Sequence, residues 1–302
     1  MRVVDLFAGC GRFSLGFQKQ GFEIAAAFEN WDAALLCYRA NFSHPAVKAD
    51  LSDTSAAAAV KKYSPDIIIG GPPCQDFSTA GKRVEADRAN LTECFVRIVA
   101  EVRQKYFVME NVSRAEKSCA YAVAREILSG SGYGLTELVL DASLCGTPQK
   151  RKRFICFGML GAEDGFAGGL FKKGLSDRPM TLRDYFEDRL GFEYYYRHPR
   201  NYSRRGIYSI DEPAPTMRGV NRPVPAGYKG HKNDPCPVSK SLHALTATDR
   251  ALIQTFPEDF VWKGNKTDIE QMIGNAVPVN LAGYVASVVR EAAGLYATAE
   301  NG

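Results

Sequence analysis

The chain has 302 residues, of which 45% are hydrophobic and 24% charged, so it is long enough to bury the core of one large domain or of two. These proportions exclude a disordered tail or a fibre, and no stretch approaches the ~20 apolar residues of a membrane-spanning helix. The apolar start is too short and too broken for a signal peptide and the net charge is only +4, so we expect a cytoplasmic protein with no membrane partner.

Short apolar runs alternate with amphipathic stretches in the first half of the chain, which is typical of βαβ units. The expected strands cover residues 3–7, 24–28, 47–49, 66–69, 107–109, 135–140 and 154–157. One helix is expected to begin near Arg12, a second to cover residues 31–40 with Asn30 as its N-cap, and a third to cover residues 89–104. The third helix carries a predicted buried stripe of Leu91, Cys94, Phe95, Ile98, Val99 and Val102. The pattern predicts a doubly wound α/β domain with a mostly parallel sheet, which binds ligands at the carboxyl ends of its strands.

Regular patterns fade after about residue 158. Seven of the fifteen prolines lie between Pro199 and Pro237, and this region is long and rich in aromatic residues, so we expect a folded, loop-rich unit and not a linker. A last helix is expected over residues 279–295, after Pro278. We therefore predict one domain over residues 1–178, completed by residues 272–302, and a smaller loop-rich domain over residues 179–271.

Three features at strand ends predict a nucleotide-like cofactor. The first strand leads into a glycine turn, Asp5-Leu6-Phe7-Ala8-Gly9-Cys10-Gly11, which lets the backbone approach a ligand closely. Glu29 ends the second strand, where a carboxylate can accept both hydroxyls of a ribose, and Asp50 ends the third, where it can accept from an adenine amino group. These features fit an adenosine-bearing cofactor but would serve NAD equally well, and the glycines alone could simply make a tight turn.

The fourth expected strand leads into Gly70-Gly71-Pro72-Pro73-Cys74-Gln75-Asp76-Phe77-Ser78. Two prolines stiffen the chain before Cys74, so its sulfur would be held at the carboxyl edge of the sheet as a candidate nucleophile. The plainer reading is a buried thiol after an ordinary turn. The other seven cysteines are scattered, with no spacing below 11, so we expect no zinc site and no redox dithiol, and most should be small buried hydrophobic residues.

The fifth expected strand leads into Glu110-Asn111-Val112, which brings a carboxyl group to the same edge. A cysteine beside an acid suits a pyrimidine substrate, because sulfur can add to C6 while the protonated acid bonds N3 and C5 becomes nucleophilic. An exposed glutamate at a strand end is the plainer reading.

Basic residues occur in two places. In Gln149-Lys150-Arg151-Lys152-Arg153, extended backbone would point Gln149, Arg151 and Arg153 to one side, toward a substrate oxygen or phosphate, although a plain basic loop explains the run as well. Residues 178–232 contain 11 Lys and Arg against 6 Asp and Glu, while the rest of the chain has 27 against 28. This segment mixes tyrosines with arginines, which suits phosphates and exposed bases, or is a solvated aromatic-rich loop region.

Taken in order, these motifs resemble the cytosine-5 DNA methyltransferases of the bacterial restriction–modification type. The matching stretches are DLFAGCG, GGPPCQDFS, ENV, QKRKR and GNAVP, which spans residues 274–278. The resemblance runs from Arg2 to about Arg290, apart from a variable segment between roughly Arg178 and Tyr208. It departs from the family at Arg12, where many members have a second glycine, and in residues 246–250, a loose version of their motif.

The resemblance implies a role for each matching residue. Cys74 matches the nucleophile, Glu110 the acid on the cytosine edge and Arg151 the arginine near the base's O2, with Arg153 in the same motif. The implied S-adenosylmethionine site comprises Asp5, Phe7, Gly9, Gly11, Glu29, Asn30, Trp31, Asp50, Leu51, Gly71, Pro73, Leu91, Asn275 and Val277. The implied DNA contacts are Gln75, Ser78, Arg197, Arg200, Arg204, Arg205 and Arg218. No metal is implied.

The implied reaction transfers a methyl group from S-adenosylmethionine to C5 of a cytosine flipped out of duplex DNA, through a covalent bond between Cys74 and C6. The loop-rich domain would recognise the target sequence. The implied partners are double-stranded DNA and a cognate restriction endonuclease that need not bind the protein. We expect a monomer in the bacterial cytoplasm, associated with the nucleoid.

Three other functions stay open at this point. The same chemistry could act on tRNA, although the long basic segment favours duplex DNA. A DNA-binding protein without turnover would have no need of an acid beside a thiol. A nicotinamide dehydrogenase would have to bind NAD.

Overall fold

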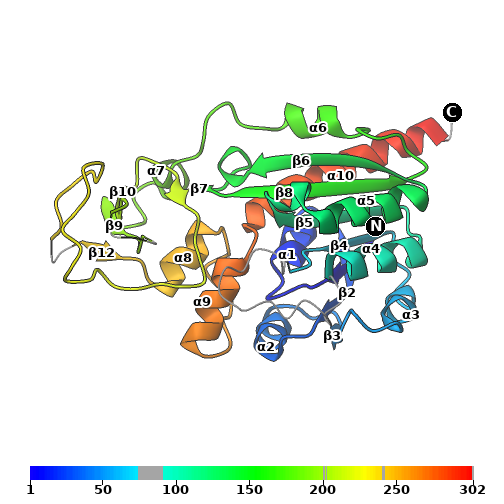
Figure 1. The fold of residues 1–302 in the computed structure, drawn as a ribbon, viewed down its shortest axis with the longest axis horizontal. Helices are drawn as coiled ribbons and strands as arrows, with labels where there is room; N and C mark the ends of the chain where they lie inside the picture. Colours follow the sequence, from blue (N-terminus) through cyan, green and yellow to red (C-terminus); the bar gives the residue numbers. More distant parts are fainter. Residues whose placement is uncertain (74–90, 200, 202, 240–241, 301–302) are drawn as a thin grey trace.

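The structure is a computed structural model that describes residues 1–73, 91–199, 201, 203–239 and 242–300. Its main body is a seven-stranded sheet in the order β3-β2-β1-β4-β5-β8-β6 (Figure 1). The strands are β1 (Arg2–Leu6), β2 (Glu23–Glu29), β3 (Ala46–Lys48), β4 (Ile67–Gly70), β5 (Tyr106–Val112), β6 (Tyr133–Asp141) and β8 (Lys152–Leu160). All neighbouring strands are parallel except β8, which runs antiparallel to both β5 and β6. The predicted doubly wound, mostly parallel sheet is therefore confirmed.

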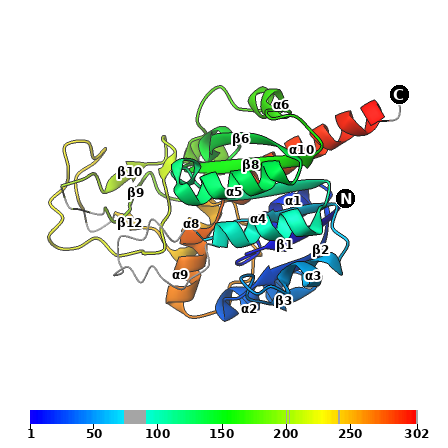
Figure 2. The same ribbon diagram turned by 45° about the vertical axis from the view of Figure 1, so that its right-hand side comes forward.

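Helices cover both faces of this sheet, as Figures 1 and 2 show. One face packs against α1 (Arg12–Lys19), α6 (Gly168–Lys173) and α10 (Val279–Glu300). The other packs against α3 (Ala56–Lys61), α4 (Leu91–Val102) and α5 (Cys119–Gly130). Each central strand supplies apolar side chains to both faces, as in β4, where all four residues are buried, and this is why its sequence is a continuous apolar run.

A smaller lobe, residues 182–245, extends from the carboxyl ends of the strands. It contains α7 (Leu182–Phe186) and a three-stranded sheet of β9 (Tyr194–Tyr196), β10 (Ile207–Ser209) and β12 (His243–Ala244), around a core that includes Phe186 and Tyr195. Most of the small lobe is irregular (Figure 1). The domain boundaries drawn from the sequence stay a prediction.

Short elements join the small lobe to the main body. β7 (Gln149–Lys150) pairs with β11 (Ala214–Pro215), and α8 (Ala247–Ile253) leads to α9 (Lys266–Asn275). The helix α2 (Asp32–Asn41) packs against α9 through a third hydrophobic cluster. Two 3₁₀ turns, η2 (Ala115–Lys117) and η3 (Ala142–Leu144), complete the described elements.

Two details differ from the sequence-based expectations. In the helix expected over residues 89–104, Phe95, Ile98 and Val99 are buried, whereas Leu91, Cys94 and Val102 are only partly buried. The expected N-cap at Asn30 is wrong: α2 begins at Asp32 with Trp31 as its N-cap. The carboxylate of Glu29 instead accepts hydrogen bonds from the backbone N–H groups of Asn30 and Trp31, both at 2.8 Å.

One helical stretch in the described chain, Lys266–Leu295, is long and apolar enough by composition to cross a membrane. In the fold, 78% of its apolar window is buried. A buried core helix passes the same test, and α10 packs along α1 in this way.

Candidate functional site

A cavity of about 690 Å³ lies at the carboxyl ends of β1, β2, β4 and β5, facing residues 216–219 and the end of α9. This is the edge at which doubly wound sheets bind ligands. Eleven of the residues selected from the sequence line it: Phe7, Gly9, Glu29, Trp31, Gly71, Pro73, Glu110, Arg151, Arg153, Arg218 and Asn275. A second cavity of similar volume between α3 and α4 contains only Leu51 of the selected set.

The turn after β1 requires glycine at two points. Gly9 and Gly11 have φ angles of 59° and 94°, in the left-handed region that other residues rarely adopt. A Cβ at Gly11 would also lie 2.2 Å from a ring atom of Phe42. Gly9 therefore presents bare backbone to the cavity, whereas Gly11 is buried beneath the turn and does not line it.

Glu29 organises this end of the cavity. Its Oε2 accepts from the backbone N–H of Gly9 at 2.7 Å, and its Oε1 accepts from the N–H groups of Asn30 and Trp31. A carboxylate offers about four lone-pair positions, so acceptor capacity is left for a ligand hydroxyl. The indole of Trp31 lines the cavity beside it.

Asp5 lies beneath the glycine turn and not in the cavity. Its side chain is fully buried, and Oδ2 accepts from the backbone N–H of Ser14 at 3.1 Å and from Ser14 Oγ at 2.7 Å. Burial raises the pKa of Asp5 to about 7, and the hydrogen bonds from Ser14 oppose this shift. Asp5 therefore fixes the start of α1 from below.

Several other selected residues do not line the cavity either. Asp50 is exposed, and its Oδ1 accepts from the N–H and Oγ of Ser52 at 2.9 and 2.7 Å, which lowers its pKa. Asn30, Leu51, Leu91 and Val277 are likewise absent from its lining.

Glu110 and Arg153 form an ion pair in the cavity wall. Arg153 Nε donates to Glu110 Oε1 at 2.7 Å, and the two side chains are 11% and 7% exposed. The pair exists because β8 runs antiparallel to β5, so the start of one strand lies beside the end of the other. Burial lowers the pKa of Arg153, and the charge of Glu110 opposes this effect. The neighbouring Asn111 donates from Nδ2 to the carbonyl of Pro72 at 3.2 Å, which ties β5 to the loop that leaves β4.

Arg151 contacts backbone instead of a carboxylate. It is 2% exposed, and its Nη1 and Nη2 donate to the carbonyls of Met217 and Gly274, each at 2.8 Å. Gln149 is fully buried on the same side and accepts from the N–H of Met217 at 3.0 Å, while Lys150 and Lys152 are exposed. The predicted alternation of this segment is confirmed, and its inward side holds residues 216–219 against α9.

Gly274 makes that junction possible. A Cβ there would lie 2.0 Å from the backbone nitrogen of Gly219 and 2.4 Å from the carbonyl carbon of Arg218. No side chain fits at this contact, so the GNAVP motif serves as a packing surface for residues 218–219.

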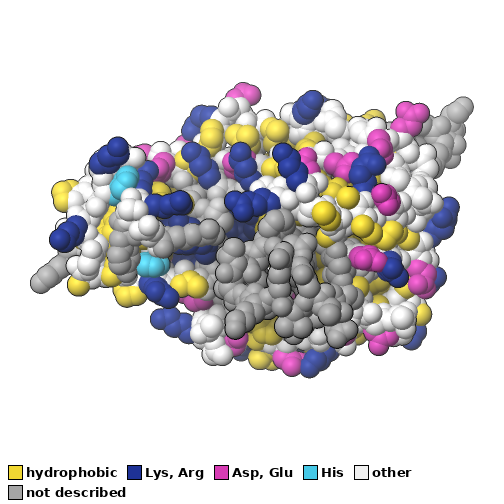
Figure 3. All heavy atoms as spheres, viewed as in Figure 1, with side chains coloured by type: hydrophobic (Ala, Val, Ile, Leu, Met, Phe, Trp, Pro, Cys, Tyr) yellow, Lys and Arg dark blue, Asp and Glu magenta, His cyan; other side chains and the backbone are white. Residues whose placement is uncertain are grey.

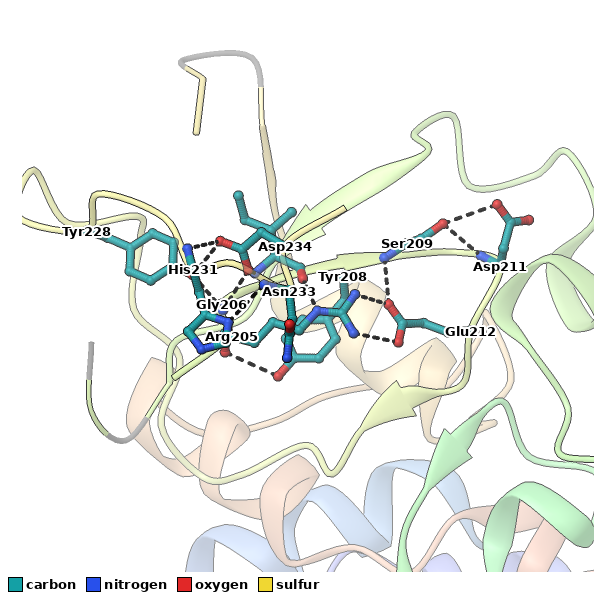
Figure 4. Close-up of polar contacts among 11 residues, drawn as sticks. Arg205, Gly206, Tyr208, Ser209, Asp211, Glu212, Tyr228, His231, Asn233 and Asp234 are labelled. Carbon is teal, nitrogen blue, oxygen red and sulfur yellow. Dashed lines mark hydrogen bonds and ion pairs between the residues drawn. The ribbon is translucent and has the colours of Figure 1, made fainter. Parts of the chain in front are cut away.

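The arginines expected to contact DNA are mostly engaged within the protein. Arg205 pairs with Glu212, with Nη1 to Oε2 at 2.8 Å, and its guanidinium lies 4.5 Å from the ring centre of Tyr208 (Figure 4). Arg197 donates to the carbonyl of Thr216 at 2.5 Å, and Arg218 to that of His198. Arg204 is exposed, as are Arg222, Lys229 and Lys232, which were not selected. Figure 3 shows Lys and Arg side chains gathered over the small lobe and its junction with the main sheet.

Four selected residues lie outside the described part of the chain: Cys74, Gln75, Ser78 and Arg200. The described residue next to Cys74 is Pro73, which is exposed and lines the cavity. Of the seven described cysteines, four are buried and none is in a disulfide, so the expectation of mostly buried thiols is confirmed for them.

Residues that the sequence does not predict at this site also line the cavity. Arg12 lines it, at the position where the sequence departs from the family pattern, and Met217, Gly219 and Met272 close it from the opposite side. The unexpected charge within the glycine turn was a signal for Arg12. Nothing in the sequence alone indicated that residues 216–219 would pack against GNAVP.

Comparison with known proteins gives a match along nearly the whole chain. Residues 1–291 match the family model described as C-5 cytosine-specific DNA methylase. The Type II methyltransferase M.HindV of Haemophilus influenzae is 55% identical over 295 residues, covering 96% of each chain. M.HgiDI of Herpetosiphon aurantiacus, also a Type II methyltransferase, is 50% identical over 289 residues, which cover 95% of this chain and 93% of its own.

Solved structures share the fold. The Dnmt2 methyltransferase of S. pombe superposes with a TM-score of 0.72 at 18% identity, covering 96% of this chain and 98% of its own. A putative DNA modification methyltransferase encoded within an E. coli prophage gives a TM-score of 0.69 at 21% identity, covering 97% and 99%. At such identities the likeness concerns the fold alone.

Proposed function

The chain belongs to the C-5 cytosine-specific DNA methylase family, and from this premise we propose that it methylates a flipped-out cytosine in a specific duplex sequence through a covalent bond to Cys74. Family and relatives together make it an S-adenosylmethionine-dependent DNA cytosine-5 methyltransferase of the Type II restriction–modification kind. The observation that carries the rest is the cavity in which Glu110, Arg153 and the loop toward Cys74 meet the glycine turn and Glu29.

The residues around the turn fit S-adenosylmethionine. Gly9 leaves backbone bare in the cavity wall, where a Cβ would lie 2.7 Å from Arg12 Nη1, and Glu29 keeps acceptor capacity for a ribose hydroxyl. Trp31 offers a ring face for the adenine, and Phe7, Gly71, Pro73 and Asn275 complete the walls. When bound there, the cofactor supplies an electrophilic methyl group. Asp5 and Gly11 support the turn from beneath.

We assign the pyrimidine chemistry to Cys74, Glu110 and Arg153. Sγ of Cys74 forms a bond to C6 and pushes electrons into the ring, while the protonated carboxyl of Glu110 bonds N3 and Arg153 bonds O2, so that C5 becomes nucleophilic. After C5 has gained the methyl group, it loses its proton to a base and the C6–S bond breaks. Arg153 suits the O2 contact better than Arg151. Both terminal nitrogens of Arg151 donate to backbone carbonyls, whereas among the described residues only Nη1 of Arg153 does so, to the carbonyl of Lys152 at 2.8 Å.

The depth of the site supports the proposal that the cytosine is flipped out of the duplex. Glu110 is 6% exposed, so a cytosine stacked within a duplex could not reach it, and rotating the base out costs a few kcal/mol of stacking. Contacts from the small lobe and from residues 216–219 would compensate for that cost, with exposed Arg204, Arg222, Lys229 and Lys232 on the phosphates. Arg151 positions the small lobe through its hydrogen bonds to the carbonyls of Met217 and Gly274. We propose a monomer that acts in the bacterial cytoplasm, with a restriction endonuclease as its functional counterpart.

Product analysis tests this function. The purified protein should be incubated with labelled S-adenosylmethionine and either plasmid DNA or tRNA, and the nucleosides analysed by mass spectrometry. We expect 5-methyldeoxycytidine in DNA, confined to one short sequence on bisulfite sequencing. Methylation of tRNA alone, or of a base other than cytosine, would contradict the proposal.

A further inference from the structure

Arg12 extends across the floor of the cavity from the first position of α1. Its Nη1 lies 2.7 Å from the point where a Cβ of Gly9 would be, and its Nη2 lies 2.9 Å from the corresponding point at Gly71. The guanidinium therefore spans the ends of β1 and β4, and it fits there because neither residue has a side chain.

The described residues supply no ion-pair partner for this guanidinium. The oxygens of Glu29 accept from three backbone amides, and Glu110 pairs with Arg153. Arg12 Nε is buried without a hydrogen-bond partner among the described residues. The charge of Arg12 also contributes to lowering the pKa of Arg151 and Arg153, so this part of the cavity carries excess positive charge. A cation that the described residues leave unpaired at a partly buried site is costly, which indicates that an anionic ligand group binds here.

We infer that Arg12 binds the α-carboxylate of the methionine part of the cofactor, an inference that rests on the proposed S-adenosylmethionine site. The cofactor has two cationic centres, the sulfonium and the ammonium, and its carboxylate is the one anion that can offset Arg12. A planar guanidinium matches a carboxylate in bidentate geometry.

The position of Arg12 agrees with this assignment. Gly9, at one end of its fork, donates to Glu29, where the ribose would bind. Gly71 lies at the other end of the guanidinium. A Cβ at Gly71 would be 2.8 Å from Oε2 of Glu110, the carboxyl group beside which the reacting base would lie. The amino-acid chain branches at the sulfur between ribose and methyl group, so its carboxylate falls within reach of a side chain that spans these two ends.

Calorimetric binding of two ligands by the full chain tests the inference. S-adenosylhomocysteine has the carboxylate, whereas its decarboxylated analogue lacks it, and neither can react. The wild type should prefer the carboxylate ligand, and Arg12→Met should reduce that preference by about ten- to a hundredfold, the effect expected for a lost charge-assisted pair. Arg12→Lys should retain part of the preference. The control Lys19→Met, on the exposed last turn of the same helix, should leave it unchanged.

The outcomes separate the possible failures. If Arg12→Met weakens both ligands equally, or weakens DNA binding alone, Arg12 does not bind the carboxylate although the cofactor site stands. If the wild type binds neither ligand, the proposed cofactor site fails and this inference with it. The melting temperature of each protein shows whether Arg12→Met is folded. If it is not, Arg12→Lys, which keeps the charge, still tests the inference.

Discussion

At the scale of single residues, the chemistry of the site depends on two buried charges of opposite sign, those of Glu110 and Arg153. Glu110 and Arg153 are nearly inaccessible and face each other at 2.7 Å, so each offsets the desolvation of the other. Glu110 Oε2, the oxygen not used in this pair, faces the end of β4 beside Gly71. That orientation directs a carboxyl oxygen toward Gly71, three residues before Cys74 in the sequence.

Replacing Glu110 by Gln tests the acid assigned to N3. An amide keeps the shape but cannot supply the proton, so kcat for DNA methylation should fall by about a hundredfold or more. DNA affinity and melting temperature, measured in parallel, should change little. Glu101→Gln, at an exposed position on α4, is the matched control and should retain full activity. A variant at Glu110 with near-normal kcat would remove this residue from the mechanism.

Asp5 predicts how stability depends on pH. Its pKa rises from 3.8 to about 7 on folding, so between these values the folded state holds a proton that the unfolded state has released. The contribution of Asp5 to the free energy of unfolding is therefore fully present below about pH 4 and is lost as the pH rises to 7. At about 1.36 kcal/mol per pKa unit, the total loss is at most about 4 kcal/mol. Urea unfolding at pH 5 and pH 8 should show the larger part of this loss, the part above pH 5, in the wild type and a smaller loss in Asp5→Asn. Equal losses in both proteins would show that Asp5 titrates normally.

At the scale of elements, the cavity is closed by a contact between two segments far apart in the sequence. Residues 216–219 are held by Gln149 and Arg151 on one side and by the end of α9 on the other. Arg151 donates to both segments, so it links the main sheet, the small lobe and α9. The GNAVP motif thus shapes the site through backbone packing.

Gly274→Ala should disturb this junction. Its Cβ would overlap the backbone of Gly219, and because backbone cannot rotate away, we expect a loss of about 1–3 kcal/mol in the free energy of unfolding and a raised KM for DNA. The matched control is Gly294→Ala in α10, where a Cβ meets no described atom within 4 Å and alanine favours the helix. Denaturant melts and kinetics on both variants measure the difference. If both variants behave alike, the close approach at Gly274 has no energetic weight.

The strands and the glycine turn could be predicted from the sequence because their signals are local. Apolar runs such as residues 67–69 are followed within one or two residues by the groups that line the cavity. The N-cap at Asn30 was wrong because a carboxylate from the preceding strand satisfies the first amides of α2, a contact that residue preference does not reveal. The link from Arg151 to Met217 spans 66 residues, and the pairing of Arg205 with Glu212 depends on the fold of the small lobe. Neither has a local signal.

At the scale of the whole molecule, the small lobe extends beyond the carboxyl edge of the sheet, and basic side chains gather over it and its junction with the sheet (Figures 1 and 3). Arg197, Arg205 and Arg218 are engaged with the protein itself, so their truncation should affect folding of the lobe as well as binding. The exposed basic residues, Arg204 and Arg222 among them, are the better candidates for phosphate contacts.

Salt dependence measures those contacts. The slope of log K for DNA binding against log salt concentration should become less steep by about 1 in Arg204→Ala, and by about 1 in Arg222→Ala. A variant that has lost one phosphate contact releases about one counterion fewer when it binds DNA. Lys61→Ala, on α3 of the main body, should leave the slope unchanged. An unaltered slope in both arginine variants would mean that this face of the lobe does not contact DNA.

Covalent trapping tests the central claim, attack of Cys74 on cytosine, most directly. A duplex that carries 5-fluorocytosine at the methylated position blocks the last step, because fluorine cannot leave C5 as a proton does. With S-adenosylmethionine present, we predict a protein–DNA complex that survives denaturing electrophoresis in the wild type and is absent in Cys74→Ala, with the peptide containing Cys74 joined to the base. If no such complex forms, or if it forms equally in Cys74→Ala, the proposed mechanism is wrong.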